Sequence, residues 1–247
     1  IWLASPREWL LPSPGDVGTV LWDDRDRLWF HAQATIAEAA VGFALAAVVG
    51  LALAILLTRS RIAEHALYPW LVASQTIPIL AIAPMIVIIS YNVLTGDNAV
   101  AHLLNLDSDA SRLVSKALIS TYLSFFPVAV GMVKGLRSPE IMHLDLMRTY
   151  YASPMQTFWK LRVPASIPFL FTSMKVAIAA SLVGAIVGEL PTGAVAGIGA
   201  KLLAGSYYSQ TIDIWAALVA GSVLAAALVA IVSIAARIVD RAMGGRP

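Results

Sequence analysis

Five long apolar stretches constrain the fold of this sequence more than any other feature. They cover residues 32–57, 67–93, 114–133, 167–190 and 214–234. A helix needs about 20 mostly apolar residues to cross the hydrocarbon core of a bilayer, so each stretch is long enough. The 247 residues are 59% hydrophobic and only 13% charged, whereas a soluble domain has about 25% charged residues. We therefore predict an all-α membrane protein with five visible spans.

Other structural classes are disfavoured by the same sequence. The apolar stretches are continuous, whereas the strands of a membrane barrel alternate apolar and polar residues over about 10 positions. The chain has no cysteine and a net charge of only +2, which excludes disulfides and thiolate metal sites and gives no reason to expect a nucleic-acid partner. The four histidines are scattered, with none three or four residues from another, so no metal site is predicted.

Lysine and arginine are distributed asymmetrically between the stretches. They collect after the first, third and fifth stretches, as Arg59, Arg61, Lys134, Arg137, Arg148, Lys160, Arg162, Arg237, Arg241 and Arg246. Basic connecting segments face the cytoplasm in membrane proteins. The C-terminus is therefore expected in the cytoplasm and residues 1–31 outside, and a chain that starts outside predicts a sixth span upstream of Ile1.

The predicted cytoplasmic segment 134–165 is long and carries two helix-start signals. Ser138, Pro139 and Glu140 predict a helix that runs to about Tyr150, with serine as the N-cap and proline in the first turn. Ser153, Pro154 and Gln156 predict a second start with a capping box. This second helix is expected to end at Pro164, because proline lacks an N–H group.

Apolar side chains in this segment are candidates for contact with a partner. Met142, Leu146 and Thr149 share one helical face, and Phe158 and Leu161 share another; Met147, Tyr150, Tyr151 and Met155 gather around the turn. Such a cluster suits a helix that docks in a groove of another protein. It suits packing on the chain's own helices equally well, and spacing alone does not decide between them.

The segment resembles the EAA loop of ABC importer permeases, written E-A-A-x3-G-x9-I-x-L-P. Asp145, Leu146 and Met147 stand at the first three positions, Tyr151 at the glycine, and Leu161, Arg162, Val163 and Pro164 at the end. Other segments resemble the nitrate/sulfonate/taurine/bicarbonate branch of that family: Pro12-Ser13-Pro14, Tyr68-Pro69, residues 74–78, Ala83-Pro84, residues 184–189 and Gly197-Ile198-Gly199. The resemblance covers nearly the whole chain.

This resemblance implies a type I importer architecture, with residues 1–31 as an extracytoplasmic segment and residues 32–247 as the permease domain. Two permease copies, expected as a homodimer, would form the pore, and an extracytoplasmic binding protein would deliver a small solute such as a sulfonate, nitrate or taurine. A separate ATPase subunit would hold ATP and Mg, and the bacterial inner membrane is the expected location. By position, the residues expected to contact the ATPase are Asp145, Leu146, Met147, Tyr150, Tyr151, Ala152, Ser153, Pro154 and Phe158.

Tyr151 departs from the family pattern, because a glycine there can adopt a positive φ that costs other residues about 1–2 kcal/mol. Either the turn is built differently, or Tyr151 fills a larger notch on its own ATPase. A subunit that no longer couples is a further alternative.

Polar residues within the spans are candidates for a pathway. Gln75, Thr76 and Pro78 predict a broken helix, which is either a gate or a structural kink. Glu38, Lys175 and Glu189 either mark a pore or an ion pair, or extend to the membrane interface, and the interface is the favoured interpretation. Among them Glu189 is retained as a pore candidate.

Two further segments have a local interpretation. Gly193, Gly197 and Gly199 predict tight turns in an outer re-entrant segment; no phosphate-binding loop of the form G-x-x-x-x-G-K-[ST] occurs, so this chain is not expected to hydrolyse ATP or bind a cofactor itself. Residues 99–106 predict a short surface helix in a longer outer loop.

Three other functions compete with the permease hypothesis. A secondary transporter or channel predicts inverted repeats, and none is found. A membrane-embedded enzyme requires polar groups at a common depth, which the spans lack. A scaffold leaves the long loop unexplained. The substrate is not determined by the sequence, and a neutral heterocycle such as a vitamin precursor stays open beside the small anions.

Overall fold

The computed structural model describes residues 11–96, 99–104, 106–191 and 196–243, and all regular elements in this part of the chain are helical. The helices are α1 (Pro14–Asp23), α2 (Arg25–Arg59), α3 (Arg61–Ser74), α4 (Ile79–Thr95), α5 (Ala99–Leu104), α6 (Ser108–Leu136), α7 (Ile141–Thr149), α8 (Pro154–Thr157), a π-helical turn (Phe158–Arg162), α9 (Val163–Glu189), α10 (Ile198–Tyr207) and α11 (Thr211–Ala242). Gly193 and Arg246 lie outside the described residues.

Four described helical segments are long and apolar enough to cross a membrane, or five if the bent pair α3 and α4 counts as one span. They match the five predicted stretches, and each helix extends past its apolar stretch into polar residues. The first of these long helices, α2, begins at Arg25, so residues 25–31 belong to the same helix as the first apolar stretch. The protein is therefore a multi-pass, all-α membrane protein.

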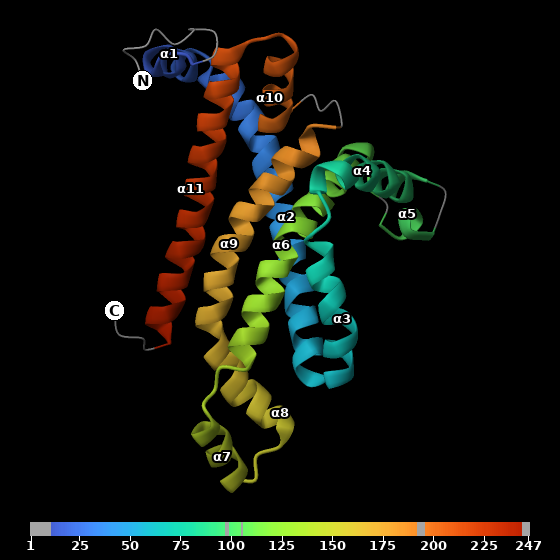
Figure 1. Cartoon of the computed structure of the whole chain (residues 1–247), viewed down its shortest axis with the longest axis vertical. Helices are drawn as coiled ribbons and strands as arrows, with labels where there is room; N and C mark the ends of the chain where they lie inside the picture. The colour runs from blue at the N-terminus through green and yellow to red at the C-terminus, as the bar shows by residue number, and fades with distance from the viewer. Residues whose placement is uncertain (1–10, 97–98, 105, 192–195, 244–247) are drawn as a thin grey trace.

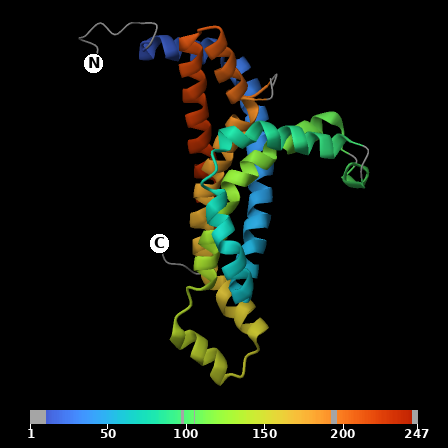
Figure 2. The same ribbon diagram turned by 45° about the vertical axis from the view of Figure 1, so that its right-hand side comes forward.

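Small residues bring the central helices α2, α6 and α9 close together. A Cβ added at Gly42 on α2 would lie 2.2 Å from Cβ of Ser120 on α6. A Cβ added at Gly131 on α6 would lie 2.4 Å from Cβ of Ser173 on α9. Close backbone approach is how helices associate in lipid, where apolar side chains gain little by leaving their surroundings. Figures 1 and 2 show α3 beside this core and α11 beside α9.

The predicted break in the second stretch is confirmed, because α3 and α4 meet at an angle of 105°. Pro78 has no N–H group to donate to the carbonyl of Ser74, four residues earlier. That carbonyl instead accepts a hydrogen bond from the hydroxyl of Tyr122 on α6. The break is thus satisfied by the neighbouring helix, and α4 projects sideways from the bundle (Figure 2).

The two ends of the bundle differ in content. We name the end that carries α1 and α10 the outer end, and the end that carries α7, α8 and the last turn of α11 the inner end, after the predicted orientation (Figure 1). The segments predicted to be cytoplasmic therefore lie at one end. Residues 99–104 form the expected short helix as α5.

Candidate functional site

The loop at the inner end begins differently from the prediction. Helix α7 starts at Ile141 with Glu140 as its N-cap and without a side-chain capping bond. The hydroxyl of Ser138 instead donates to the carbonyl of Gly135, at 2.8 Å. The predicted serine cap is wrong, because Ser138 satisfies a carbonyl at the end of α6 rather than an N–H group at the start of α7.

The turn after α7 explains the unusual position of Tyr151. Its φ is +50°, its N–H donates to the carbonyl of Arg148 at 2.9 Å, and the N–H of Ala152 donates to the carbonyl of Met147 at 3.0 Å. These two bonds define a Schellman motif, whose left-handed residue is usually glycine. The turn is therefore the one that a glycine would make, built here with a tyrosine that is 96% exposed.

The second helix start is confirmed in detail. The Ser153 hydroxyl accepts from the N–H of Gln156 at 3.2 Å, and the Gln156 side chain accepts from the N–H of Ser153 at 2.8 Å. Pro154 occupies the first turn of α8. This reciprocal capping box fixes the direction in which the chain returns to the membrane.

The predicted helix end at Pro164 is wrong. The chain passes from α8 through the π-helical turn Phe158–Arg162 directly into α9, as one helical segment from Pro154 to Glu189. In this turn the N–H of Val163 donates to the carbonyl of Phe158, five residues earlier. Pro164 is the second residue of α9 and directly follows this turn, so its missing N–H group falls where the hydrogen-bonding pattern already departs from the α-helical one, and the helix continues through it.

Phe158 anchors this turn in the bundle. Its side chain is only 7% exposed and packs with Ala54, Met132 and Leu136. The guanidinium of Arg59 lies 5.8 Å from the centre of its ring, and that of Arg162 donates to the carbonyl of Leu136 at 3.2 Å. Phe158 is therefore covered by the chain's own spans and joins the loop to them, which differs from the exposed position expected of an ATPase contact; the contact itself stays a prediction.

The other predicted contact residues remain accessible. Asp145 is exposed and pairs with Arg148 at 2.8 Å. The exposed members of the set are Leu146, Tyr150, Tyr151, Ser153 and Pro154, together with Met155, and the half-buried ones are Met147 and Ala152. No residue of α7 is buried. The structure thus separates an exposed tip, residues 141–157, from a buried anchor at Phe158.

Glu189 lies in a buried cluster at the outer end. It is 0% exposed, and its carboxylate accepts from the hydroxyl of Thr35 at 2.6 Å and from the N–H of Gly199 at 2.5 Å. The same Thr35 hydroxyl accepts from the N–H of Ile198 at 2.9 Å. The carboxylate therefore holds the start of α10 against α2 and does not face an open pathway.

The predicted extension of Glu38 and Glu189 to the interface is wrong. Glu38 is also buried and pairs with Lys116 at 2.7 Å; Lys175 is half-buried. Two of the partners are distant in sequence: Lys116 on α6 lies 78 residues from Glu38, and Thr35 on α2 lies 154 residues from Glu189. The glycine at position 197 is a local hint of this cluster in the sequence. In the structure its φ is +135°, and an added Cβ would lie 2.2 Å from Cδ of Glu189.

The predicted gate residues lie together at the break between α3 and α4. Gln75 is half-buried and donates to the Ser74 hydroxyl at 3.2 Å, while Thr76 and Pro78 are exposed. Their role as a gate stays a prediction.

Comparison with known proteins decides the family. Residues 8–245 match the family described as the binding-protein-dependent transport system inner membrane component. The chain belongs to this family. It is 34% identical over 195 residues, 76% of this chain and 70% of the other, to the formylaminopyrimidine transport permease protein of Halalkalibacterium halodurans.

Further relatives of this binding-protein-dependent permease have names that refer to different substrates. The riboflavin transport system permease protein of Chloroflexus aurantiacus is 28% identical, over 78% of this chain and 65% of the other. The nitrate import permease protein of a Synechocystis strain is 29% identical, over 67% of this chain and 53% of the other. The chain is therefore an ABC transporter permease, and the secondary-transporter alternative fits less well.

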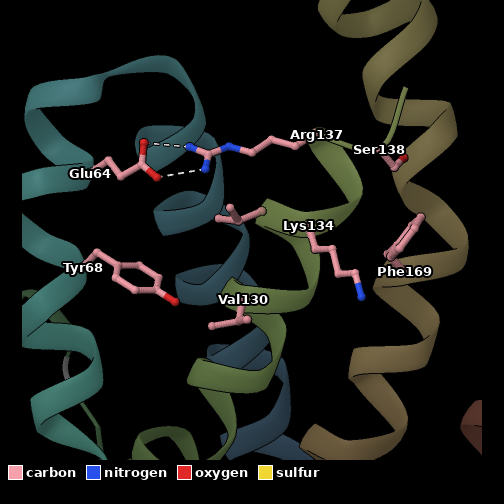
Figure 3. Close-up of a pocket in the computed structure, with 8 residues that line it drawn as sticks. Glu64, Tyr68, Val130, Lys134, Arg137, Ser138 and Phe169 are labelled. Carbon is pink, nitrogen blue, oxygen red and sulfur yellow. Dashed lines mark hydrogen bonds and ion pairs between the residues drawn. The ribbon is translucent and has the colours of Figure 1, made fainter. Parts of the chain in front are cut away.

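The permease has a further feature at the inner end that the sequence did not indicate. Glu64 on α3 and Arg137 after α6 form two hydrogen bonds of 2.8 Å beside a cavity of about 500 Å³ (Figure 3). Hydrogen bonding to Glu64 raises the pKa of Arg137. Figure 3 shows Tyr68, Val130 and Phe169 around the same space. The pair joins helices that are far apart in sequence, so no spacing pattern reveals it.

Proposed function

We propose that two copies of this permease form the pathway of an ATP-driven importer, with α7 and α8 docked in a cleft of a separate ATPase subunit. In this arrangement the inner end and the C-terminus face the cytoplasm of a bacterial cell. The ATPase holds ATP and Mg, this chain is non-catalytic, and an extracytoplasmic binding protein meets the outer end. Family membership and the lysine and arginine distribution support each part.

One observation carries the coupling proposal: the loop combines an exposed tip with a buried anchor. Leu146, Tyr150 and Tyr151 expose apolar surface at the tip, and nothing within α7 is buried. Phe158 packs against Ala54 and Leu136 of two spans. A force applied to the tip would therefore pass through the π-helical turn into α2, α6 and α9. Packed elements transmit displacement because they are poorly compressible.

A small solute is the proposed substrate. The relatives are named for nitrate import, bicarbonate transport, formylaminopyrimidine transport and riboflavin transport. We propose a small solute such as nitrate, a sulfonate or taurine, with a nitrogen heterocycle as the second candidate because the formylaminopyrimidine permease is 34% identical. Uptake assays with radiolabelled members of both classes separate them.

A matched pair of tyrosine variants tests the coupling. Tyr150→Ala/Tyr151→Ala removes two exposed rings from the inner end, and Tyr207→Ala/Tyr208→Ala removes two rings of similar exposure from the outer end. Tagged protein is purified from native membranes in mild detergent, and co-purifying proteins are identified by mass spectrometry. We expect an ATPase with the native protein and the outer variant, and its loss from the inner variant.

Two results contradict the proposal. A homo-oligomer recovered without any ATPase removes the importer mechanism for this chain and favours a channel. Equal ATPase recovery with both double variants leaves the importer in place and removes the loop tip as the docking site.

A further inference from the structure

A basic cavity of about 440 Å³ opens at the inner end, where α2 meets α3. Its lining includes the arginines Arg59, Arg61 and Arg137 and the acid Glu64. Glu64 pairs with Arg137, and within the described part of the chain no ion pair involves Arg59 or Arg61. Two guanidinium charges in this cavity are therefore unbalanced.

The basic cavity lies beside a mainly apolar groove. Glu64 and Arg137 also line the cavity shown in Figure 3, whose other walls include Tyr68, Val130 and Phe169, together with Lys134. Val130 and Phe169 in turn line a third cavity of about 600 Å³ that runs along α6 and α9. The three cavities share wall residues, so a charged recess and a mainly apolar path along the spans lie next to each other, on either side of the Glu64–Arg137 pair.

The position of this surface indicates its ligand. The long helix α2 ends at Arg59 and α6 ends at Leu136, so the basic recess lies at the level where the spans leave the membrane. Lipid headgroups occupy this level, and basic pockets between spans bind anionic ones. Guanidinium groups match the geometry of a phosphate through paired hydrogen bonds.

We propose that this surface binds one anionic phospholipid, with its phosphate at Arg59 and Arg61 and an acyl chain along Tyr68, Val130 and Phe169. The site reaches the coupling loop directly. Arg59 lies 3.8 Å from the sulfur of Met155 on α8 and 5.8 Å from the ring centre of Phe158. A phosphate bound to Arg59 would therefore fix the base of the loop. The inference does not depend on an ATPase.

Native mass spectrometry tests the site on the full chain. The protein is placed in nanodiscs of phosphatidylglycerol and phosphatidylcholine in equal amounts, and the phosphatidylglycerol retained after release is counted. Arg59→Gln/Arg61→Gln is compared with Arg237→Gln/Arg241→Gln, which removes two exposed arginines from α11 at the same end. We expect retention to fall roughly fivefold per arginine in the first variant, since each contributes about 1 kcal/mol, and to stay unchanged in the second.

Two further arms separate the sources of the phosphate. In the first arm, Val130→Trp fills the groove and is expected to lower phosphatidylglycerol retention. In the second arm, inorganic phosphate is added in excess to the native protein and is expected not to displace the lipid. Displacement by inorganic phosphate together with no effect of Val130→Trp would assign a free phosphate and overturn the lipid proposal.

Loss of a dimer by Val130→Trp, with lipid retention unchanged, would assign the groove to a second copy and overturn the proposal too. Equal phosphatidylglycerol retention in the two arginine double variants would also overturn the proposal. If Arg59→Gln/Arg61→Gln fails to fold, Arg59→Lys/Arg61→Lys replaces it, because this variant keeps the charge but loses the paired hydrogen-bond geometry. We expect it to retain less phosphatidylglycerol than the native protein. Unchanged lipid retention would overturn the role of the guanidinium groups.

Discussion

Two helix ends in this permease carry the same backbone turn in different surroundings. Tyr151 after α7 and Ser209 after α10 both have a positive φ, +50° and +55°. In each turn the next N–H donates to a carbonyl five residues earlier, Ala152 to Met147 and Gln210 to Gly205. The Schellman motif is therefore formed twice without glycine, once at the inner end and once at the outer end.

The helices that precede these turns are held very differently. The start of α10 is bound by Glu189 and Thr35, and Lys201 pairs with Asp24 and Asp213 at 3.2 and 3.3 Å. Helix α7 has no buried residue. Helix α10 is therefore held by its own chain, whereas every side chain of α7 is exposed or half-buried, so the surface of α7 is accessible to another protein. Regions with few buried contacts open at low free energy.

The largest effect is expected from a variant that removes the hydrogen bonds of Glu189 to the start of α10. Glu189→Ala deletes the acceptor for Thr35 and Gly199, and leaving two buried donors without this partner costs about 4 kcal/mol together. We expect a large fall in the unfolding temperature of the detergent-purified protein. Asp213→Asn, which alters a partly exposed ion pair at the same end, is the control and should change stability by less than about 1 kcal/mol. Equal effects of the two variants would contradict the distinction between the ends.

The second-largest effect is expected at Phe158, the buried anchor of the loop. Phe158→Ala leaves a cavity between Ala54 and Leu136 and should cost about 3 kcal/mol of stability. It should also reduce ATPase stimulation by the permease, because the tip loses its connection to the spans. Trp159→Ala, which truncates the exposed neighbour on the same turn, serves as the control. Full stimulation by Phe158→Ala would show that force travels by another route.

Tyr151 gives a smaller and more specific effect. Tyr151→Gly should stabilise the turn by about 1 kcal/mol, because glycine adopts a positive φ without steric cost. Tyr151→Ala keeps the strain, and both variants lose the ring. We expect both to weaken ATPase stimulation without affecting membrane insertion, and only the glycine variant to gain stability. Recovery of stimulation by glycine but not by alanine would mean that the backbone, rather than the ring, matters for coupling.

The smallest effect is expected at Asp145. Its pair with Arg148 is exposed, so Asp145→Asn should change the free energy of unfolding by less than about 0.5 kcal/mol. Binding of the ATPase, measured by co-purification at two salt concentrations, should weaken and lose part of its salt dependence. Unchanged binding would remove Asp145 from the docking surface.

The sequence alone determined the features that depend on short-range chemistry. The apolar stretches fixed the spans, since their length has to match the bilayer. Ser153 and Gln156 specified a capping box three residues apart, and it forms as predicted. Pro78 specified the break between α3 and α4, although the sequence did not indicate that Tyr122 would satisfy the carbonyl it leaves free.

Only the tertiary structure decided which side chains are covered. Phe158 and Tyr151 are both aromatic residues near one turn, yet Phe158 is 7% and Tyr151 is 96% exposed. Their spacing in the sequence does not distinguish the buried ring from the exposed one. Glu189 looks like an interfacial charge until α2 and α10 supply its partners, and Pro164 looks like a helix end until the π-helical turn places it in the first turn of α9. Burial depends on contacts between helices distant in sequence, whereas capping and breaking depend on neighbours a few residues away.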